Sequence, residues 1–190
     1  MLKIAILASG SGSNAQALVE YFVHSPWGRV EIIVTNNSRA GVIERSSRLG
    51  IKCFLFDPAS QSEEILTLLR SSIDVIILAG YLKKIPNNWI RSFRGRMINI
   101  HPALLPKFGG KGMYGIHVHK AVSDSREATT GITIHEVNER YDEGAIIAQY
   151  RVEITPGESP LGIQEKVRML EQRYFGQTAE TWIKEISNQQ

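Results

Sequence analysis

The stretch LKIAILASGSGSN, residues 2–14, decides the fold class of this chain. Residues 2–8 are almost all apolar, which is typical of a buried strand. Residues 9–14 are serines and glycines closed by an asparagine, and they predict a tight turn. The segment after the turn has apolar side chains at helical spacing, namely Ala15, Leu18, Val19 and Phe22. A strand, a glycine-rich turn and a helix in this order predict the opening of a βαβ unit.

The same alternation continues through the first hundred residues. Apolar runs predict further strands at residues 30–35, 52–56, 74–78 and 97–101, and helical spacing predicts helices at 40–49 and from Ser62 to Leu69. Because strands alternate with helices, we expect an α/β fold with a doubly wound, mostly parallel sheet and helices on both of its faces.

The last third of the chain follows a different pattern. Strands are predicted at residues 129–137 and 145–154, and the seven residues between them suit an antiparallel C-terminal hairpin rather than a helical crossover. Ser159 and Pro160 are typical of a helix N-terminus. The helical pattern that follows runs to about Ile186, and we expect a break in it near Gly176.

Composition limits the class of protein. A chain of 190 residues with 43% hydrophobic and 22% charged residues suits one compact domain, which we expect to cover residues 1–190. The formal net charge is +3 and the Lys and Arg residues are scattered, which argues against a nucleic-acid partner. No apolar run is long enough for a membrane span, and residues 1–3 do not resemble the start of a signal peptide. We therefore expect a cytoplasmic protein, either a monomer or a homodimer.

The glycine-rich turn is a candidate phosphate site. A helix N-terminus has free N–H groups and a partial positive charge, and glycine lets the backbone approach an anion closely. The turn is not a Walker A motif, because no Lys-Ser or Lys-Thr pair follows Gly12. It also departs from the dinucleotide fingerprint, because the second strand ends at Thr35 and Asn36 instead of an acidic residue. A tight turn that merely starts a helix remains the alternative.

The strand MINIH, residues 97–101, is a candidate catalytic segment. Asn99 and His101 are two residues apart, so on a strand they point to the same side. Pro102 and Pro106 end the strand and stiffen the segment that follows. An amide donor and a proton-carrying imidazole at the end of a strand suit an active site in an open α/β sheet. The alternative is a strand that ends in a surface histidine.

Several motifs in order resemble those of the folate-dependent formyltransferases. The motifs are Gly10-Ser11-Gly12-Ser13-Asn14, Ala79-Gly80-Tyr81-Leu82, Asn99-Ile100-His101-Pro102 with Leu104-Leu105-Pro106, residues 107–112, residues 131–135, and Asp142-Glu143-Gly144. Over nearly the whole chain the match is to the phosphoribosylglycinamide formyltransferase family. This resemblance implies a single α/β domain that transfers a formyl group from 10-formyltetrahydrofolate to the amine of glycinamide ribonucleotide.

The resemblance also implies roles for particular residues. The catalytic residues of the family match Asn99, His101 and Asp142. The residues that bind the nucleotide substrate match Gly12, Ser13, Asn14, Ala15, Gln16 and Glu171, and the folate-binding segment matches Leu82, Lys83, Lys84 and Ile85 together with Asn99. The implied ligands are the two small-molecule substrates, with 10-formyltetrahydrofolate as co-substrate.

The chain departs from the family pattern at a few positions. Residues 61–64 lack the arginine that helps to hold folate in relatives, and Ala103 replaces a common serine. Lys83-Lys84 stands where one basic residue and an apolar one are usual, and either forms a solvated face or anchors the glutamate tail of folate. Around Glu171 the sequence EQRYFG replaces a usual Glu-His and Tyr-Pro pattern.

The residues suggest a mechanism without a metal ion or a covalent enzyme intermediate. Asn99 can donate to the oxyanion of a tetrahedral intermediate, and a protonated His101 can donate to it and move protons. A neighbouring Asp142 carboxylate is expected to raise the pKa of His101. Without the resemblance, Asp142 would be interpreted as a solvated loop carboxylate. His135 is expected to be a supporting core residue.

Other interpretations remain open. His117 and His119 either approach the cleft or form a weak metal site that lacks a third ligand. A formyltransferase acting on methionyl-tRNA or an amino sugar usually has a second domain and lacks the Gly-Ser-Gly-Ser-Asn turn. A non-catalytic nucleotide-binding module of doubly wound type would bind a nucleotide without turnover.

Overall fold

The computed structural model describes residues 1–188. Gln189 and Gln190, which the expected single domain includes, lie outside the described residues. The elements in order are β1 (Leu2–Leu7), α1 (Ser13–Phe22), β2 (Gly28–Thr35), α2 (Val42–Arg48), β3 (Lys52–Leu55), α3 (Ser62–Ser72), β4 (Val75–Leu78), α4 (Asn87–Ser92), β5 (Met97–His101), α5 (Ile116–Asp124), β6 (Thr129–Glu136), β7 (Ile146–Glu153) and α6 (Pro160–Ser187).

The strands form one seven-stranded sheet in the order β3-β2-β1-β4-β5-β6-β7. The first five strands are parallel, whereas β6 runs antiparallel to both β5 and β7. The expected doubly wound sheet with an antiparallel C-terminal hairpin is therefore confirmed. The strand order reverses between β1 and β4, and at such a point the loops beyond the strand ends separate and leave room for a ligand.

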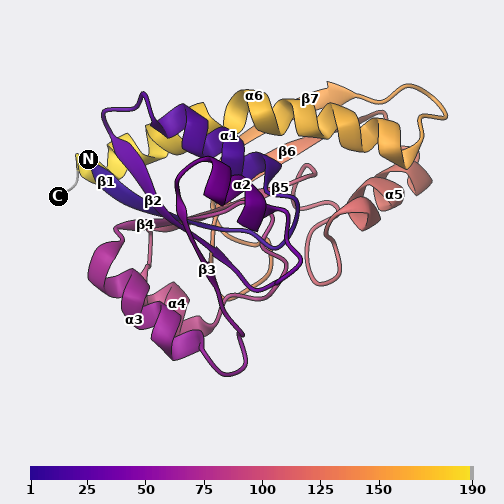
Figure 1. Ribbon diagram of the computed structural model, residues 1–190. Coiled ribbons are helices and arrows are strands. Elements are labelled where there is room, and N and C mark those ends of the chain that lie inside the picture. The colour runs from indigo at the N-terminus through magenta and orange to yellow at the C-terminus, as the bar shows by residue number, and fades with distance from the viewer. Residues whose placement is uncertain (189–190) are drawn as a thin grey trace.

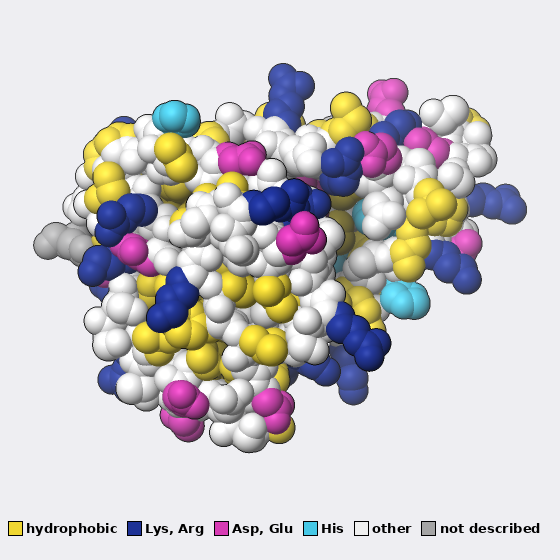
Figure 2. All heavy atoms as spheres, viewed as in Figure 1, with side chains coloured by type: hydrophobic (Ala, Val, Ile, Leu, Met, Phe, Trp, Pro, Cys, Tyr) yellow, Lys and Arg dark blue, Asp and Glu magenta, His cyan; other side chains and the backbone are white. Residues whose placement is uncertain are grey.

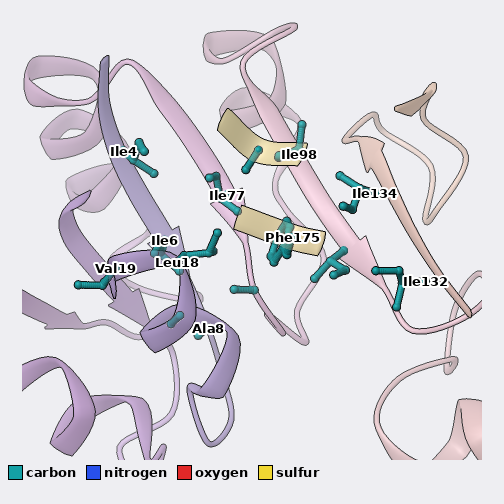
Figure 3. Close-up of a cluster of buried hydrophobic side chains, with 14 of the residues drawn as sticks. Ile4, Ile6, Ala8, Leu18, Val19, Ile77, Ile98, Ile132, Ile134 and Phe175 are labelled. Carbon is teal, nitrogen blue, oxygen red and sulfur yellow. The ribbon is translucent and has the colours of Figure 1, made fainter. Parts of the chain in front are cut away.

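Helices cover both faces of the sheet (Figure 1). On one face α1, α2, α5 and α6 pack over a core to which β1, β4, β5 and β6 contribute alternate side chains. Figure 3 shows these side chains converging from strands and helices, with Phe175 of α6 opposite Ile77 and Ile98 of the sheet. The other face carries α3 and α4 over a second core that includes Leu69 and Trp89. Because both faces of the sheet are covered, every side chain of β4 is buried and apolar.

The long helix α6 begins as predicted but does not break at Gly176. Ser159 is its N-cap, and the Ser159 side chain accepts a hydrogen bond from the backbone N–H of Gly162. The helix runs without interruption through Gly176. Helix α1 packs closely against this position and leaves no room for a side chain. A Cβ atom at Gly176 would lie 2.6 Å from ring atoms of Tyr21 on α1. The expected break is therefore wrong, and the glycine serves the contact between α1 and α6.

Short helix α4 was not predicted from the sequence. Pro86 precedes it in an extended conformation, and its Trp89 and Ile90 are buried in the second core. Trp89 stacks on Phe56, with 5.9 Å between the ring centroids. A six-residue segment is too short to show helical spacing, so tertiary packing decides whether this segment is helical.

Among the helices of residues 1–188, none combines the length and the apolar character that a membrane span needs.

Candidate active site

A cavity of about 760 Å³ opens beyond the carboxyl ends of β1, β4 and β5. The cavity walls come from the β1–α1 turn, residues 78–85, the end of β5, the glycine-rich segment 110–115, the loop before β7 and the first half of α6. Figure 2 shows the surface hollowed between the body of the molecule and the part that carries α5, with histidine side chains in and beside the hollow. A volume of this size is within the usual range for small-molecule sites.

The β1–α1 turn forms one end of the cavity. Gly12 has a φ of 80°, and a Cβ atom there would lie 2.7 Å from Val42. A side chain at Gly12 is therefore excluded by both the backbone and the packing. The first N–H groups of α1 have no partner within the helix, and Ser13 and Asn14 border the cavity. The expected anion site is thus an open helix N-terminus.

Two residues of the expected nucleotide-binding segment do not reach the cavity. The side chain of Ala15 is fully buried in the core under α1. Gln16 donates its backbone N–H to the carbonyl oxygen of Gly12, and its side chain bonds Glu20 and Arg45. The helical turn carries both side chains away from the cavity, so the structure does not support a contact between Gln16 and a ligand.

Asn14 and Glu171 meet across the cavity wall. The Asn14 Nδ2 donates to Glu171 Oε2 at 3.0 Å. Burial raises the pKa of Glu171 to about 7, and the Asn14 hydrogen bond and the charge of Arg168 only partly oppose this effect. The Oδ1 atom of Asn14 is buried and has no hydrogen-bond partner among the described residues. The pair therefore offers an unused acceptor and a carboxyl that titrates near neutral pH.

His101 and Asp142 lie together at the centre of the cavity. The Nδ1 atom of His101 is 3.6 Å from Oδ2 of Asp142, and the two side chains are 4% and 12% exposed. His101 Nε2 donates to the carbonyl oxygen of Phe108 at 2.7 Å, since a carbonyl can only accept. Asp142 Oδ2 also accepts from the N–H of Gly110 at 2.8 Å. Residues 108–110 therefore orient both groups.

The pKa of His101 differs from the sequence-based expectation. Burial lowers this pKa below 6.5, and the charge of Asp142 raises it by less than burial lowers it. The expected increase is wrong because the loss of hydration on burial lowers the pKa of His101 more than the charge of Asp142 raises it. For Asp142, burial raises the pKa, but His135, His101 and the N–H of Gly110 together outweigh burial and leave the pKa below its ordinary value. The resting state is an uncharged imidazole beside a carboxylate.

Asn99 is oriented by His135. The two residues are directly opposite each other in the β5–β6 pairing, and Asn99 Nδ2 lies 3.2 Å from His135 Nε2. His135 Nδ1 donates to the carbonyl oxygen of Glu136 at 2.8 Å, so Nε2 of an uncharged ring is the acceptor. One N–H of the Asn99 amide is thus occupied, and the second N–H is available to a ligand. His135 Nε2 also lies 3.6 Å from Asp142 Oδ1.

The opposite wall consists of the segment after β4. Leu82, Lys83, Lys84 and Ile85 all border the cavity, as the resemblance implied. The backbone N–H of Leu82 donates to the side chain of Ser9, which ties this wall to the end of β1. Lys84 lies over the ring of Tyr141, 5.8 Å from its centroid. Gln61 is not part of this wall, because its side chain accepts from the backbone N–H of Asp57.

The structure adds site residues that sequence reasoning missed. His135 was expected to support the core, but it contacts both Asn99 and Asp142 and borders the cavity. The alternation along β6 was visible in the sequence, whereas its register against β5 was not. Arg168 also borders the cavity. His119 borders it too, which agrees with one of the two interpretations that the sequence left open for His117 and His119. In the part of the chain that the structure describes, no cluster of three or more His, Cys, Asp or Glu residues is placed to hold a metal ion.

Comparisons with known proteins agree with the sequence motifs. A family model described as formyl transferase matches residues 2–178. A phosphoribosylglycinamide formyltransferase from Bacillus subtilis is 34% identical over 92% of this chain and 91% of that relative. The chain belongs to the phosphoribosylglycinamide formyltransferase family. The resemblance seen in the sequence is thereby confirmed.

Other members of the phosphoribosylglycinamide formyltransferase family give the same result. The crystal structure of glycinamide ribonucleotide transformylase 1 from Geobacillus kaustophilus superposes with a TM-score of 0.88 at 34% identity, covering 96% of this chain and 99% of that chain. A chloroplastic relative from Arabidopsis thaliana is 41% identical over 91% of this chain, but the chain spans only about three fifths (62%) of that relative's length.

Proposed function

We propose that this protein transfers a formyl group from 10-formyltetrahydrofolate to the amine of glycinamide ribonucleotide, a step of de novo purine biosynthesis. One observation carries the proposal. Asn99, His101 and Asp142 meet in a cavity that has an anion-binding helix terminus at one end and an apolar wall with two lysines at the other. A phosphorylated amine and an anionic folate would bring their reacting groups together between these ends. Family membership supports the same activity.

The nucleotide substrate suits the end formed by α1 and α6. Its phosphate would accept from the free N–H groups of Ser13 and Asn14, with the Arg168 guanidinium on the same side of the cavity. Its ribose hydroxyls are donors, and the unpaired Asn14 Oδ1 and the carboxyl of Glu171 are acceptors without enough donors of their own. Binding the ribose would therefore satisfy polar atoms that the fold leaves unpaired.

The folate substrate suits the opposite end. Leu82 and Ile85 offer an apolar surface for a flat ring system, and Tyr141 adds an aromatic ring. Lys83 and Lys84 are exposed at this wall and can attract the carboxylates of the glutamate tail. They would supply the positive charge that an arginine near Gln61 supplies in relatives. 10-Formyltetrahydrofolate is a substrate here and is consumed in each turnover.

The reaction needs one proton transfer and one site for negative charge. The amine of the nucleotide attacks the formyl carbon, so a C–N bond forms and the carbonyl oxygen becomes negative. The free N–H of Asn99 can donate to this oxygen, a contribution of about 3–4 kcal/mol for comparable donors. The uncharged His101 accepts the proton of the amine and Asp142 stabilises the resulting imidazolium. His101 then returns the proton to the folate nitrogen as its bond to the formyl carbon breaks.

A direct assay tests this proposal. Purified protein is mixed with glycinamide ribonucleotide and 10-formyltetrahydrofolate, and the appearance of deformylated tetrahydrofolate is followed. We expect turnover that depends on both substrates. His101→Ala should lower kcat by about 10²–10⁴-fold, the usual range for a general acid–base group. The same variant should bind glycinamide ribonucleotide with nearly unchanged affinity, because the phosphate and ribose of the nucleotide contact the end of the cavity formed by α1 and α6.

The matched control is His117→Ala, which removes an exposed imidazole two residues from the buried His119. This variant should keep wild-type turnover. Binding of the nucleotide without turnover by the wild type would instead indicate a non-catalytic nucleotide-binding module. Wild-type turnover in His101→Ala would remove this residue from the mechanism.

A further inference from the structure

Polar atoms that the fold leaves without a partner point to the contacts of a ligand. Within residues 1–188, the enclosed side-chain nitrogen and oxygen atoms that lack a hydrogen bond are Asn14 Oδ1, His119 Nδ1 and Thr130 Oγ1. Asn14 and His119 both border the 760 Å³ cavity, whereas Thr130 borders a separate pocket beside the hairpin. Asn14 belongs to the nucleotide end described above. His119 has no role in the binding or the chemistry proposed so far.

His119 is held firmly in the cavity wall. It lies on α5 between Val118 and Val122, which are fully buried in the main core, and it is itself only 3% exposed. Helix α5 packs against α6, the helix that carries Arg168 and Glu171. His101 is near enough that its protonated form lowers the pKa of His119 further. His119 therefore borders the cavity near His101, on a helix that packs against the one carrying Arg168 and Glu171.

The imidazole of His119 contributes no hydrogen bond to the fold. Its Nδ1 atom is enclosed and has no hydrogen-bond partner among the described residues. Burial lowers the pKa of His119 to about 4, so at neutral pH the uncharged ring has one donor nitrogen and one acceptor nitrogen. Enclosing such a ring without a partner costs free energy. An apolar side chain would suit this position better if packing were its only purpose.

We propose that His119 hydrogen-bonds the amide group that links the reacting amine of the nucleotide substrate to its ribose. The amide lies one carbon from the amine, which meets His101, and it joins the ribose, which meets Asn14 and Glu171. His119 borders the same cavity near His101, on the helix packed against α6, which puts the amide within its reach. The amide has a donor N–H and an acceptor carbonyl oxygen, and one of the two can pair with a ring nitrogen of His119. His119 is thus a positioning residue that aims the amine at the formyl carbon, and this inference rests on the proposed function.

A metal site shared with His117 does not fit the geometry. Residues two apart on a helix do not face each other. The ring of His117 is exposed and packs edge-on against Tyr114, with 5.6 Å between the ring centroids. His119, in contrast, is enclosed at the wall of the cavity. The two histidines therefore have different surroundings, and His117 serves as the matched control.

The test compares two ligands in calorimetric titrations of the full chain. Wild type, His119→Phe, His119→Gln and His117→Phe are titrated with glycinamide ribonucleotide and with ribose 5-phosphate, which has the phosphate and ribose but no glycinamide. We expect His119→Phe to weaken glycinamide ribonucleotide binding at least tenfold and to change ribose 5-phosphate binding less than twofold. His119→Gln, which retains a donor and an acceptor, should recover part of the loss, and His117→Phe should match wild type.

Stability and kinetics separate this role from a structural one. The melting temperature of His119→Phe should equal or exceed that of wild type, because the variant no longer encloses an unpaired polar ring. In the formyl-transfer assay, KM for the nucleotide should rise at least tenfold while KM for the folate stays within twofold. A lower melting temperature with equal weakening of both ligands would overturn the proposal, because His119 would then only support the fold.

Unchanged binding of glycinamide ribonucleotide in His119→Phe would also overturn the proposal. Failure of the proposed function looks different. If wild type binds glycinamide ribonucleotide but does not turn over, the activity is wrong, and the comparison of the two ligands still decides the role of His119. If wild type binds neither ligand, both proposals fall together.

Discussion

Glu171 is a single side chain whose charge depends on pH within the physiological range. Its pKa is raised to about 7 by burial, against an ordinary value of 4.5. The folded protein therefore holds the Glu171 proton up to a higher pH than the unfolded chain does. The stability that the neutral carboxyl contributes is fully present below pH 4.5 and is lost as pH rises through 7. A ligand that donates a hydrogen bond to the ionised Glu171 carboxylate would restore part of this lost stability.

Glu171→Gln should remove this pH dependence. At pH 8.5 the variant should be more stable than wild type by up to about 3 kcal/mol, because it has no carboxylate to bury. At pH 5 the advantage should shrink to a small fraction of that value, because the wild-type carboxyl is then protonated. Urea unfolding at the two pH values measures the difference. An advantage that is the same at both pH values would show that Glu171 ionises normally in the folded protein.

At the scale of elements, the fit between α1 and α6 depends on one position. Gly176 lies in the middle of a 28-residue helix, where glycine is about 1 kcal/mol less favourable than alanine. The ring of Tyr21 occupies the space that a Cβ atom would need, and the Tyr21 hydroxyl donates to Glu180 one turn farther along α6. Close packing of the two helices outweighs the intrinsic cost of the glycine.

A double-mutant cycle tests this balance. Gly176→Ala alone should destabilise the protein by about 1 kcal/mol, because displacing the Tyr21 ring costs about 1–3 kcal/mol and exceeds the gain in helix propensity. In a Tyr21→Ala background the same substitution should stabilise by about 0.5–1 kcal/mol, because the obstacle is gone. Thermal unfolding of the four proteins gives the coupling energy. Stabilisation by Gly176→Ala in both backgrounds would show that Tyr21 does not restrict this position.

At the scale of the whole molecule, the cavity is assembled from segments that are distant in the sequence. Asn14 and Glu171 are 157 positions apart, and the Gly110–Asp142 bond spans 32 positions. The strand order brings these segments to one edge of the sheet, and the hairpin β6–β7 closes the far side. A ligand in the cavity would therefore link the first βα unit, the hairpin and α6 to one another.

Ligand binding should accordingly stabilise the whole fold. Glycinamide ribonucleotide at one hundred times its Kd should add about 2.7 kcal/mol to the free energy of unfolding. For a chain of this size the melting temperature should rise by about 5–10 °C. Differential scanning fluorimetry measures the shift, and the His101→Ala variant should retain it. No shift at saturating concentrations would show that the cavity does not take this nucleotide.

Local sequence patterns determined the order of elements, the glycine-rich turn and the shared direction of Asn99 and His101. Strand alternation, helical spacing and glycine turns are properties of neighbouring residues, so they can be seen without knowledge of the fold. The motifs also indicated the family. Local patterns did not predict the short α4 or the uninterrupted α6. Both depend on contacts between residues far apart in the sequence, Trp89 with Phe56 and Tyr21 with Gly176.

Only the tertiary structure decided which polar groups meet in the cavity. By sequence alone Asp142 was a solvated loop carboxylate and His135 a core residue, yet both contact the catalytic candidates. The register of β6 against β5 sets His135 opposite Asn99, and a one-residue slip would turn it to the other face. Burial then sets the protonation states, lowering the pKa of His101 where a neighbouring carboxylate suggested the opposite. Pairing register and desolvation depend on the packed molecule, because both arise from residues far apart in the chain.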